Sequence, residues 1–523
     1  MERPAVTNWE RRYADFPTPV ETADGQLFQR DEVAAWLARR PIPTKSLRDD
    51  ELPGATYGSR LNPGAQAGAQ RDGPVSAQGR RLVREAADLT ADLHRSATRD
   101  GVYWHVVLAL VFLRRERPLA WRDLVVSLNE SSRPTDRLAD TFADTGLVES
   151  ARVARRLADV QPAVWHALGR AIHILDGVGV ESSDLIGIFD HALDQLGDGM
   201  SGQFFTPRSV ARLIAELVGP ITAGSRCLDP FSRAGELLVE VAVASGGSPP
   251  LVVRASHPES TLVELAEMNL VMHGAGATVS KSELGSLAMA AMDRFDIVVS
   301  NPPFGLLSDA EVGGMRRRYG PSRRKEFNWL QLAVESLDEN GRGAVIMPNG
   351  AASTLAPRER EIRRGLVEDG ALAAVVALPT QLFGGTSIGV ALWLVRRPSR
   401  RREDVLFIDA QTLGGMSTRT RRQLAPHDIE EVSQEYRRWL SVGRTDRKFV
   451  PRVGFSATAT ATAIADQNYS LFPPSYVQPE SVATGHPSDA DFSELTSELI
   501  QLTNVARGID ADVHEMLRGL GQR

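Results

Sequence analysis

The sequence lacks several features that would assign it to a specialised class. Cys227 is the single cysteine among 523 residues, so an internal disulfide and a cysteine metal cluster are both excluded. A lone cysteine is most often a small buried hydrophobe. The N-terminus shows no basic patch followed by an apolar core, the pattern of a signal peptide. These absences favour a protein of the reducing cytoplasm, and we expect no metal site.

Long apolar runs are also missing. The longest run, Val102 to Leu113, is shorter than the roughly twenty residues that a membrane span requires. We therefore expect a buried helix there and no membrane partner. The net charge of −6 is mild, and it neither indicates nor excludes a nucleic-acid partner because local patches matter more than the sum. The length exceeds that of one hydrophobic core and predicts several domains.

Residues 1–45 form a small unit with a short basic helix, Val6 to Arg12, then an extended segment and a turn. This unit resembles the second half of winged helix-turn-helix modules of the excisionase and MerR type. The resemblance implies that Asn8, Arg11 and Arg12 lie on a DNA-recognition helix. The first helix of such modules has no counterpart before Met1, so an arm that docks on the body of the protein is the alternative.

Changes in composition and hydrophobic periodicity divide the rest of the chain into five units. A Gly, Ala, Gln and Pro-rich linker precedes a region of helical periodicity, and a region of short strands and helices follows. Near the C-terminus, apolar residues from Phe492 to Leu520 alternate in steps of three and four, which predicts a helix that packs along another helix, of a partner or of this chain. The predicted units are 46–78 (linker), 79–197 (helical domain), 198–400 (catalytic domain), 401–480 (its extension) and 488–520 (heptad helix).

Between residues 198 and 400, brief apolar runs alternate with amphipathic helices. Examples are Phe295 to Val299, Gly343 to Met347 and Val390 to Val395. This alternation predicts an α/β fold with a doubly wound, mostly parallel sheet covered on both faces. Ligands of such sheets bind beyond the carboxyl ends of the strands, where the two most distinctive motifs fall.

The first motif, Asn301-Pro302-Pro303-Phe304, directly follows the strand that ends at Ser300. The exocyclic amine of adenine is a poor nucleophile because its lone pair is delocalised into the ring. An Asn oxygen and a proline-flanked backbone carbonyl that accept its hydrogens favour a pyramidal, reactive nitrogen. The prolines stiffen the turn, and Phe304 offers a stacking surface for an extruded base. The alternative is a rigid turn without chemistry.

The second motif, Asp229-Pro230-Phe231-Ser232-Arg233-Ala234-Gly235-Glu236, joins a strand to a helix, as the nucleoside-binding loops of doubly wound folds do. Asp229 has a plainer interpretation as the cap of the following helix. A third motif, Gly202-Gln203-Phe204-Phe205-Thr206-Pro207, precedes the helix Ser209 to Val218. Thr206 has the plain interpretation of N-cap, with Pro207 at the first helical position.

In this order, the three motifs resemble those of the N6-adenine DNA methylases, the modification subunits of type I restriction-modification systems. The likeness extends from about Asp184 to about Val477. It implies the class I methyltransferase fold, S-adenosyl-L-methionine as methyl donor, double-stranded DNA as substrate, and a specificity or defence-system subunit as partner. Asn301 to Phe304 match the residues that hold the adenine. The matching cofactor residues are Gln203, Phe204, Phe205, Thr206, Pro207, Asp229, Pro230, Ser232, Gly235 and Glu236, with Glu259 for the ribose.

Three positions depart from the family pattern. Arg233 and Ala234 stand where the loop usually has Gly and Ser, so that a side chain at 233 crowds the cofactor or is forced to a positive φ. His257 stands where an acidic residue usually grips the ribose, and Ser282-Glu283 replace an expected Asp. A cofactor-impaired homologue that binds DNA or assists assembly is therefore the alternative function. A methyltransferase of protein amides or small amines is a third.

Basic clusters follow the segment Asn301 to Phe304, which we call the catalytic turn. They supply candidate phosphate contacts, although a run of charge is often only a solvated face. These clusters are Arg316-Arg317-Arg318 and Arg323-Arg324-Lys325.

Overall fold

The computed structural model describes most of the region from residue 102 to 477 and a few positions before it. The described residues are 20–22, 25–27, 33, 36, 37, 40, 102–130, 134–157, 162–179, 183–199, 205–222, 224–245, 252–281, 294–305, 317–383, 388–399, 404–417, 421–442 and 449–477. Several expectations lie outside them: the contacts Asn8, Arg11, Arg12 and Arg316, the loop residues Gln203 and Phe204, Ser282-Glu283, the linker and the heptad helix.

Near the N-terminus, strands β1 (Val20–Thr22) and β2 (Gly25–Leu27) pair in antiparallel fashion, with Val20 opposite Leu27. The recognition helix of the winged helix-turn-helix module stays a prediction.

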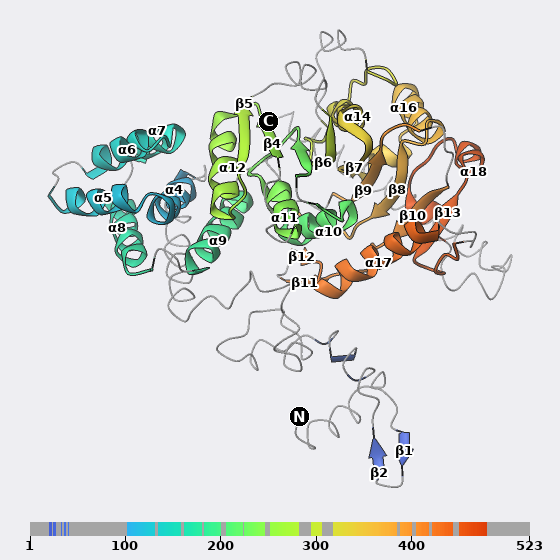
Figure 1. Ribbon diagram of the computed structural model, residues 1–523, viewed down its shortest axis with the longest axis horizontal. Coiled ribbons are helices and arrows are strands. Elements are labelled where there is room, and N and C mark those ends of the chain that lie inside the picture. Colours follow the sequence, from blue (N-terminus) through green and yellow to red (C-terminus); the bar gives the residue numbers. More distant parts are fainter. Residues whose placement is uncertain are drawn as a thin grey trace, which may run out of the picture.

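A group of helices forms the end of the molecule next to β5 and α12 (Figure 1). The predicted buried helix is α4, whose side chains from Val106 to Leu113 are almost all inaccessible to solvent. No helix in the described part of the chain is long and apolar enough to cross a membrane. The group comprises α4 (Val102–Glu116), α5 (Pro118–Glu130), α6 (Pro134–Asp144), α7 (Val148–Leu157), α8 (Pro162–Asp176) and α9 (Ser183–Gly199).

Helix α12 (Ser260–Met272) joins these helices to the sheet, and its apolar face shares their hydrophobic core. Glu264 of α12 is buried and accepts hydrogen bonds from the backbone N–H groups of Glu149 and Ser150, at 2.7 and 2.8 Å. The hydroxyl of Ser150 also donates to Glu264, and His105 lies 3.5 Å from the same carboxylate. The first turn of α7 is therefore capped by a side chain from α12.

A 9-stranded sheet in the order β13-β10-β8-β9-β7-β6-β3-β4-β5 forms the centre of the molecule. The run from β7 to β5 is parallel throughout. Strand β9 is antiparallel to both neighbours, and β13 is antiparallel to β10. The strands are β3 (Arg226–Asp229), β4 (Val252–His257), β5 (Ala277–Lys281), β6 (Phe295–Ser300), β7 (Leu337–Pro348), β8 (Leu372–Ala377), β9 (Val390–Arg396), β10 (Val405–Asp409) and β13 (Ser456–Ala459).

Helices cover both faces of this sheet, as the alternating pattern predicts (Figure 1). One face packs against α10 (Arg208–Val218), α11 (Glu236–Ala244) and α17 (Pro426–Val442). The other packs against α14 (Lys325–Ser336), α15 (Asn349–Ser353), α16 (Pro357–Glu368) and α18 (Ala461–Asp466). A short hairpin of β11 (Gly415–Met416) and β12 (Arg422–Gln423) and the 3₁₀ helix η5 (Pro473–Ser475) complete the described elements.

Cys227 lies on β3 and is fully buried, as expected of a small hydrophobe. Burial raises the pKa of its thiol to about 12, with a further contribution from the nearby charge of Asp296. The reactive thiolate is thus disfavoured at neutral pH.

The chain changes direction in the sheet at β3. From β3 it runs outward through β4 to β5, and then returns to place β6 on the other side of β3. Ligands of doubly wound sheets bind at the carboxyl edge where the chain reverses in this way, and the edge between β3 and β6 is called the crevice below.

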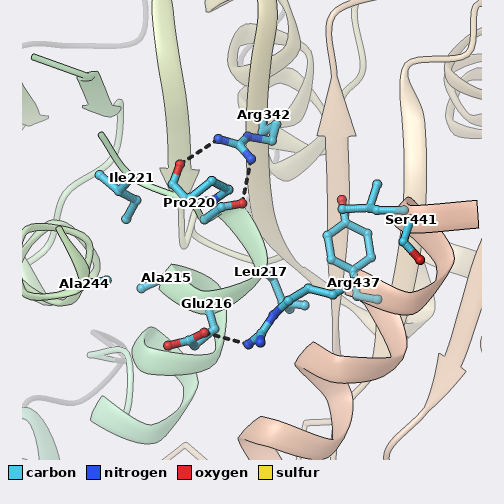
Figure 2. A pocket seen from close by; sticks show the side chains of 12 residues that line it. Ala215, Glu216, Leu217, Pro220, Ile221, Ala244, Arg342, Arg437 and Ser441 are labelled. Atoms are coloured by element: carbon cyan, nitrogen blue, oxygen red, sulfur yellow. Dashed lines mark hydrogen bonds and ion pairs between the residues drawn. The ribbon is translucent and has the colours of Figure 1, made fainter. Parts of the chain in front are cut away.

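A hollow of about 420 Å³ lies between the C-terminal ends of α10, α11 and α17, beside Arg342 of β7 (Figure 2). Arg342 donates to the carbonyls of Gly219 and Pro220 on one side of it, and Arg437 pairs with Glu216 on the other. This hollow is separate from the crevice.

Candidate active site

Strands β3 and β6 are hydrogen-bonded neighbours, with Cys227 opposite Ile297 and Leu228 opposite Val298. Their carboxyl ends therefore lie side by side. The loop after β3 begins at Asp229, and the turn after β6 begins at Asn301. The sheet topology thus brings together the two motifs that the sequence separates by about seventy residues.

Asn301 is buried at the start of the catalytic turn. Its amide Nδ2 donates to the Oγ1 of Thr206 at 3.0 Å, and the amide oxygen Oδ1 consequently points away from Thr206. Pro302 is buried beside it, while Pro303 and Phe304 are half-buried, and the ring of Phe304 packs against the core beneath α10. The turn therefore presents a fixed hydrogen-bond acceptor and a partly exposed aromatic surface.

The bond from Asn301 corrects one expectation. Thr206 is not the N-cap of α10: Pro207 occupies that position, without a side-chain cap. The Thr206 hydroxyl instead serves the catalytic turn, 95 residues away in the chain. A cap and a long-range partner look alike in sequence, because both need only a Thr before a helix.

The loop after β3 closes tightly around Gly235, which has a φ of +80°. A Cβ at this position would lie 3.3 Å from the carbonyl oxygen of Ala266 on α12, so glycine is required for both reasons. Ser232 donates its backbone N–H to the carbonyl of Ser256 at 2.8 Å, which ties the loop to the end of β4. Ala234 is buried in the core shared with the helices, so its replacement of the family's Ser fits the packing.

Glu236 begins α11 and stabilises two loops at once. Its carboxylate accepts the backbone N–H of Thr206 at 2.9 Å and that of Ala234 at 3.0 Å. Burial raises the pKa of Glu236, while these hydrogen bonds act in the opposite direction. Phe205 and Pro207 flank the Thr206 contact, so the third motif is attached to the second through this carboxylate.

Asp229 is buried at the carboxyl end of β3 and does not cap α11, whose N-cap is Gly235. It accepts the backbone N–H of Phe231 at 3.1 Å, two residues on, which shapes the turn through Pro230. Burial, together with the nearby charge of Glu236, raises the pKa of Asp229 to about 8. Its carboxyl group is thus largely protonated at neutral pH.

Arg233 extends from the loop Asp229 to Glu236, called the cofactor loop below, toward the catalytic turn. Its side chain is buried, and its Nε donates to the backbone carbonyl of Asn301 at 3.3 Å. Its guanidinium carbon lies 5.5 Å from the ring centre of Phe231. Arg233 does not have a positive φ, so the backbone strain expected at this position is absent. The described non-glycine residues with positive φ are Gln381, Asn468 and Tyr469.

Aromatic side chains pack behind Arg233. The rings of Phe231 and His257 are 4.6 Å apart, and those of Phe231 and Trp329 are 5.2 Å apart, both edge to face. Burial and the charge of Arg233 lower the pKa of His257 to about 4, so the ring is neutral and its Nδ1 accepts the backbone N–H of Glu259 at 3.0 Å. Trp329 on α14 was not foreseen, because its spacing is that of an ordinary core residue.

Of the predicted phosphate contacts, Arg317 differs from a solvated basic cluster. It is buried, and its guanidinium pairs with Glu335 at 2.8 Å. Arg318 pairs with Asp369 at 2.7 Å, although half of its side chain is exposed. Arg323 is exposed and Arg324 and Lys325 are half-buried at the start of α14. The second cluster therefore offers more accessible charge than the first.

The crevice between β3 and β6 matches the chemistry of a nucleoside cofactor with a cationic amino-acid tail. Carboxyl oxygens of Asp229, Glu236 and Glu259 supply acceptors for ammonium and hydroxyl groups. The buried hydroxyl of Ser232 has no hydrogen-bond partner among the residues that the structure describes. Gly235 provides the close approach of the backbone. Arg233 is the one cation among these acceptors.

Comparison with known proteins agrees with this geometry. The model of the family described as N-6 DNA Methylase matches residues 184–484, more than half of the chain. The chain belongs to this family. Its fold is that of the class I methyltransferases, its methyl donor is S-adenosyl-L-methionine, and its activity class is adenine-specific DNA methylation, which confirms these expectations.

Similar curated proteins are methylase subunits of type I restriction enzymes. The HindI methylase subunit of Haemophilus influenzae is 27% identical over 360 residues, which cover 66% of this chain and 80% of the relative. The MjaIX methylase subunit of Methanocaldococcus jannaschii is 26% identical over 385 residues, or 68% of this chain and 65% of the relative. A crystal structure of a type I restriction-modification methyltransferase subunit from Streptococcus thermophilus superposes with a TM-score of 0.60 at 18% identity, covering 76% of this chain and all (100%) of that one.

Proposed function

We propose that this chain is the modification subunit of a restriction-modification or phage-defence system, and that it methylates the N6 amine of an adenine extruded from duplex DNA. The observation that carries the proposal is the hydrogen bond from Asn301 to Thr206, next to the loop of Asp229 to Glu236. It fixes an acceptor at the carboxyl edge of the sheet, beside the residues suited to the cofactor.

The residues of the catalytic turn have separate tasks in this reaction. Asn301 accepts a hydrogen bond from the adenine amine through Oδ1, because Nδ2 is held by Thr206. A backbone carbonyl of the proline turn accepts the second hydrogen, and Phe304 stacks on the extruded base. Asn301 is a neutral amide and no base, so the proton released by the amine passes to water.

The cofactor loop holds the methyl donor. S-adenosyl-L-methionine supplies a methyl group on a positively charged sulfur. Glu236 and Asp229 accept hydrogen bonds from its amino-acid part, Gly235 admits the close approach, and Glu259 binds the ribose hydroxyls. Phe205, Thr206 and Pro207 close the pocket from the side of α10, where Glu236 anchors the backbone of Thr206.

Two finer points belong to the proposal. The heptad pattern of residues 488–520 supports a helix that docks on a specificity subunit. Arg323, Arg324 and Lys325 support a phosphate contact at the start of α14, a short distance in the chain after the catalytic turn.

Methylation of duplex DNA tests the proposal directly. The purified chain, alone and with the products of neighbouring genes, is incubated with labelled S-adenosyl-L-methionine and unmethylated DNA, and N6-methyladenine is mapped by long-read sequencing. We expect methyladenine at defined sites. A parallel incubation with cell-extract proteins detects methylation of protein amides, and label found there alone contradicts the proposal. Absence of cofactor binding at millimolar concentration, with and without DNA, favours the cofactor-impaired homologue instead.

A further inference from the structure

Arg233 is a buried cation in the loop proposed to bind a cationic cofactor. Its side chain is almost fully enclosed, and its guanidinium is held between the carbonyl of Asn301 and the ring of Phe231. The loop around it is rigid, because Ser232 is tied to Ser256 and Asn269 of α12 donates to the carbonyl of Ala234 at 2.7 Å. The guanidinium is thus a fixed part of the crevice.

The charges around Arg233 are carboxylates. Burial lowers the pKa of Arg233, while the nearby charges of Glu236 and Glu259, and that of Asp229 where it is ionised, act in the opposite direction. Glu236 lies three residues after Arg233 in the same loop, and its carboxylate is fixed by the backbone N–H groups of Thr206 and Ala234. The crevice therefore already contains its own counter-cation.

We propose that Arg233 acts as an internal cation that competes with the sulfonium of S-adenosyl-L-methionine for the carboxyl groups around Glu236. It thereby lowers the affinity of the chain for the charged cofactor relative to its affinity for the product, S-adenosylhomocysteine. This inference rests on the proposed function, because it places the cofactor at the same loop. Two cations in one poorly solvated crevice repel each other strongly. S-adenosylhomocysteine lacks the sulfonium charge and escapes that part of the repulsion.

The position of Arg233 also joins the two halves of the site. Its Nε donates a hydrogen bond to the backbone carbonyl of Asn301, the first residue of the turn proposed to hold the adenine. Arg233 is therefore a positioning and specificity residue, because it acts on the cofactor through charge and on the base through the Asn301 backbone.

Binding calorimetry with two ligands separates charge from bulk. Arg233→Met keeps the unbranched stem of the side chain without its charge, Arg233→Gln is a second neutral variant, and Arg233→Lys keeps the charge. We expect each neutral variant to raise the ratio of S-adenosyl-L-methionine affinity to S-adenosylhomocysteine affinity about tenfold. Arg233→Lys leaves the ratio near that of the unmodified chain. The matched control is Arg155→Met, which removes an exposed arginine on α7.

The outcomes are distinguishable. Equal shifts for both ligands, or a lower ratio in both neutral variants, show that Arg233 acts through packing alone and overturn the inference. Failure of the unmodified chain and of every variant to bind either ligand overturns the proposed function together with it. Circular dichroism melting identifies a variant that does not fold, and the other neutral variant then decides the outcome.

Discussion

The catalytic turn after β6 and the cofactor loop after β3 lie side by side but are stabilised in different ways. Prolines stiffen the turn, and the side chain of Asn301 is oriented by a neutral hydrogen bond to Thr206, although its backbone carbonyl also accepts the Nε of Arg233. The loop is built on buried ionisable groups, Asp229, Arg233 and Glu236, whose pKa values all depart from the ordinary. A neutral, prearranged acceptor works with little sensitivity to its surroundings. A cluster of buried charges depends on each of its members.

The strongest test of this contrast removes the acceptor of the turn. Asn301→Ala is expected to lower the rate of methylation about 10²- to 10³-fold, the range seen when one prearranged polar contact to a reacting group is lost. DNA affinity should stay nearly unchanged, because the proposed function places only the extruded base, and no phosphate, against Asn301. Single-turnover kinetics and a DNA-binding titration measure the two effects. A comparable loss of both would remove Asn301 from the chemistry.

A second test concerns the loop and its dependence on pH. The folded chain holds the pKa of Asp229 at about 8, above its ordinary value of 3.8, so the folded state keeps a proton that the unfolded state releases. That contribution to stability is present at low pH and is lost as the pH rises toward 8. Asp229→Asn lacks this loss.

We therefore expect the stability of Asp229→Asn relative to the unmodified chain to increase by about 3 kcal/mol between pH 5 and pH 8. Denaturant unfolding without cofactor, at a series of pH values, measures it. Burial lowers the pKa of His257 to about 4, but this residue is the same in both chains, so its contribution to the pH dependence cancels in the difference. A flat or falling difference would place Asp229 in a solvated environment.

A third test weakens the turn without touching the acceptor. Thr206→Val removes the hydroxyl that orients the Asn301 amide, and a neutral hydrogen bond of this kind corresponds to about a tenfold loss of rate. Thr206→Ser keeps the hydroxyl and should restore most of the activity. Equal rates in the two variants would show that the prolines alone orient Asn301.

The smallest expected effect extends the comparison to the residues after the turn. Neutralising Arg323 and Lys325 together should make the dependence of log DNA affinity on log salt concentration shallower by about two. Arg152→Ala is the control, since this arginine is exposed on α7 far along the chain. Arg317→Ala should instead destabilise the fold, because it leaves Glu335 without its buried partner. An unchanged salt slope in the double variant would assign the DNA contacts to other residues.

The sequence predicts the parts of the fold that depend on local pattern. The strand Phe295–Ser300 is found with the expected bounds, and the expected helix Ser209 to Val218 is α10, which begins one residue earlier at Arg208. The antiparallel direction of β9 is not legible in the chain, because a fully buried strand reads alike in either direction. The position of the crevice is also predictable from the motifs, because strand ends and glycine turns are features of the local sequence.

Long-range side-chain contacts explain what sequence reasoning missed. Thr206 and Asn301 meet across 95 residues, and nothing local distinguishes a cap from such a partner. Arg233 was noted as a departure from the family pattern, yet its contact with the Asn301 carbonyl depends on the adjacency of β3 and β6. The burial of Arg317 depends likewise on Glu335, which a run of three arginines does not reveal.

The capping of α7 by Glu264 has a consequence for the order in which the chain is made. Glu264 follows Ser150 by 114 residues, so the ribosome completes the helical region long before its cap and its covering helix exist. Until α12 emerges, the apolar face that Leu262, Leu265 and Met268 will cover is open to other chains. A nascent chain that pauses before residue 260 should therefore need a chaperone. One that pauses after Met272 already carries the partner that closes this core.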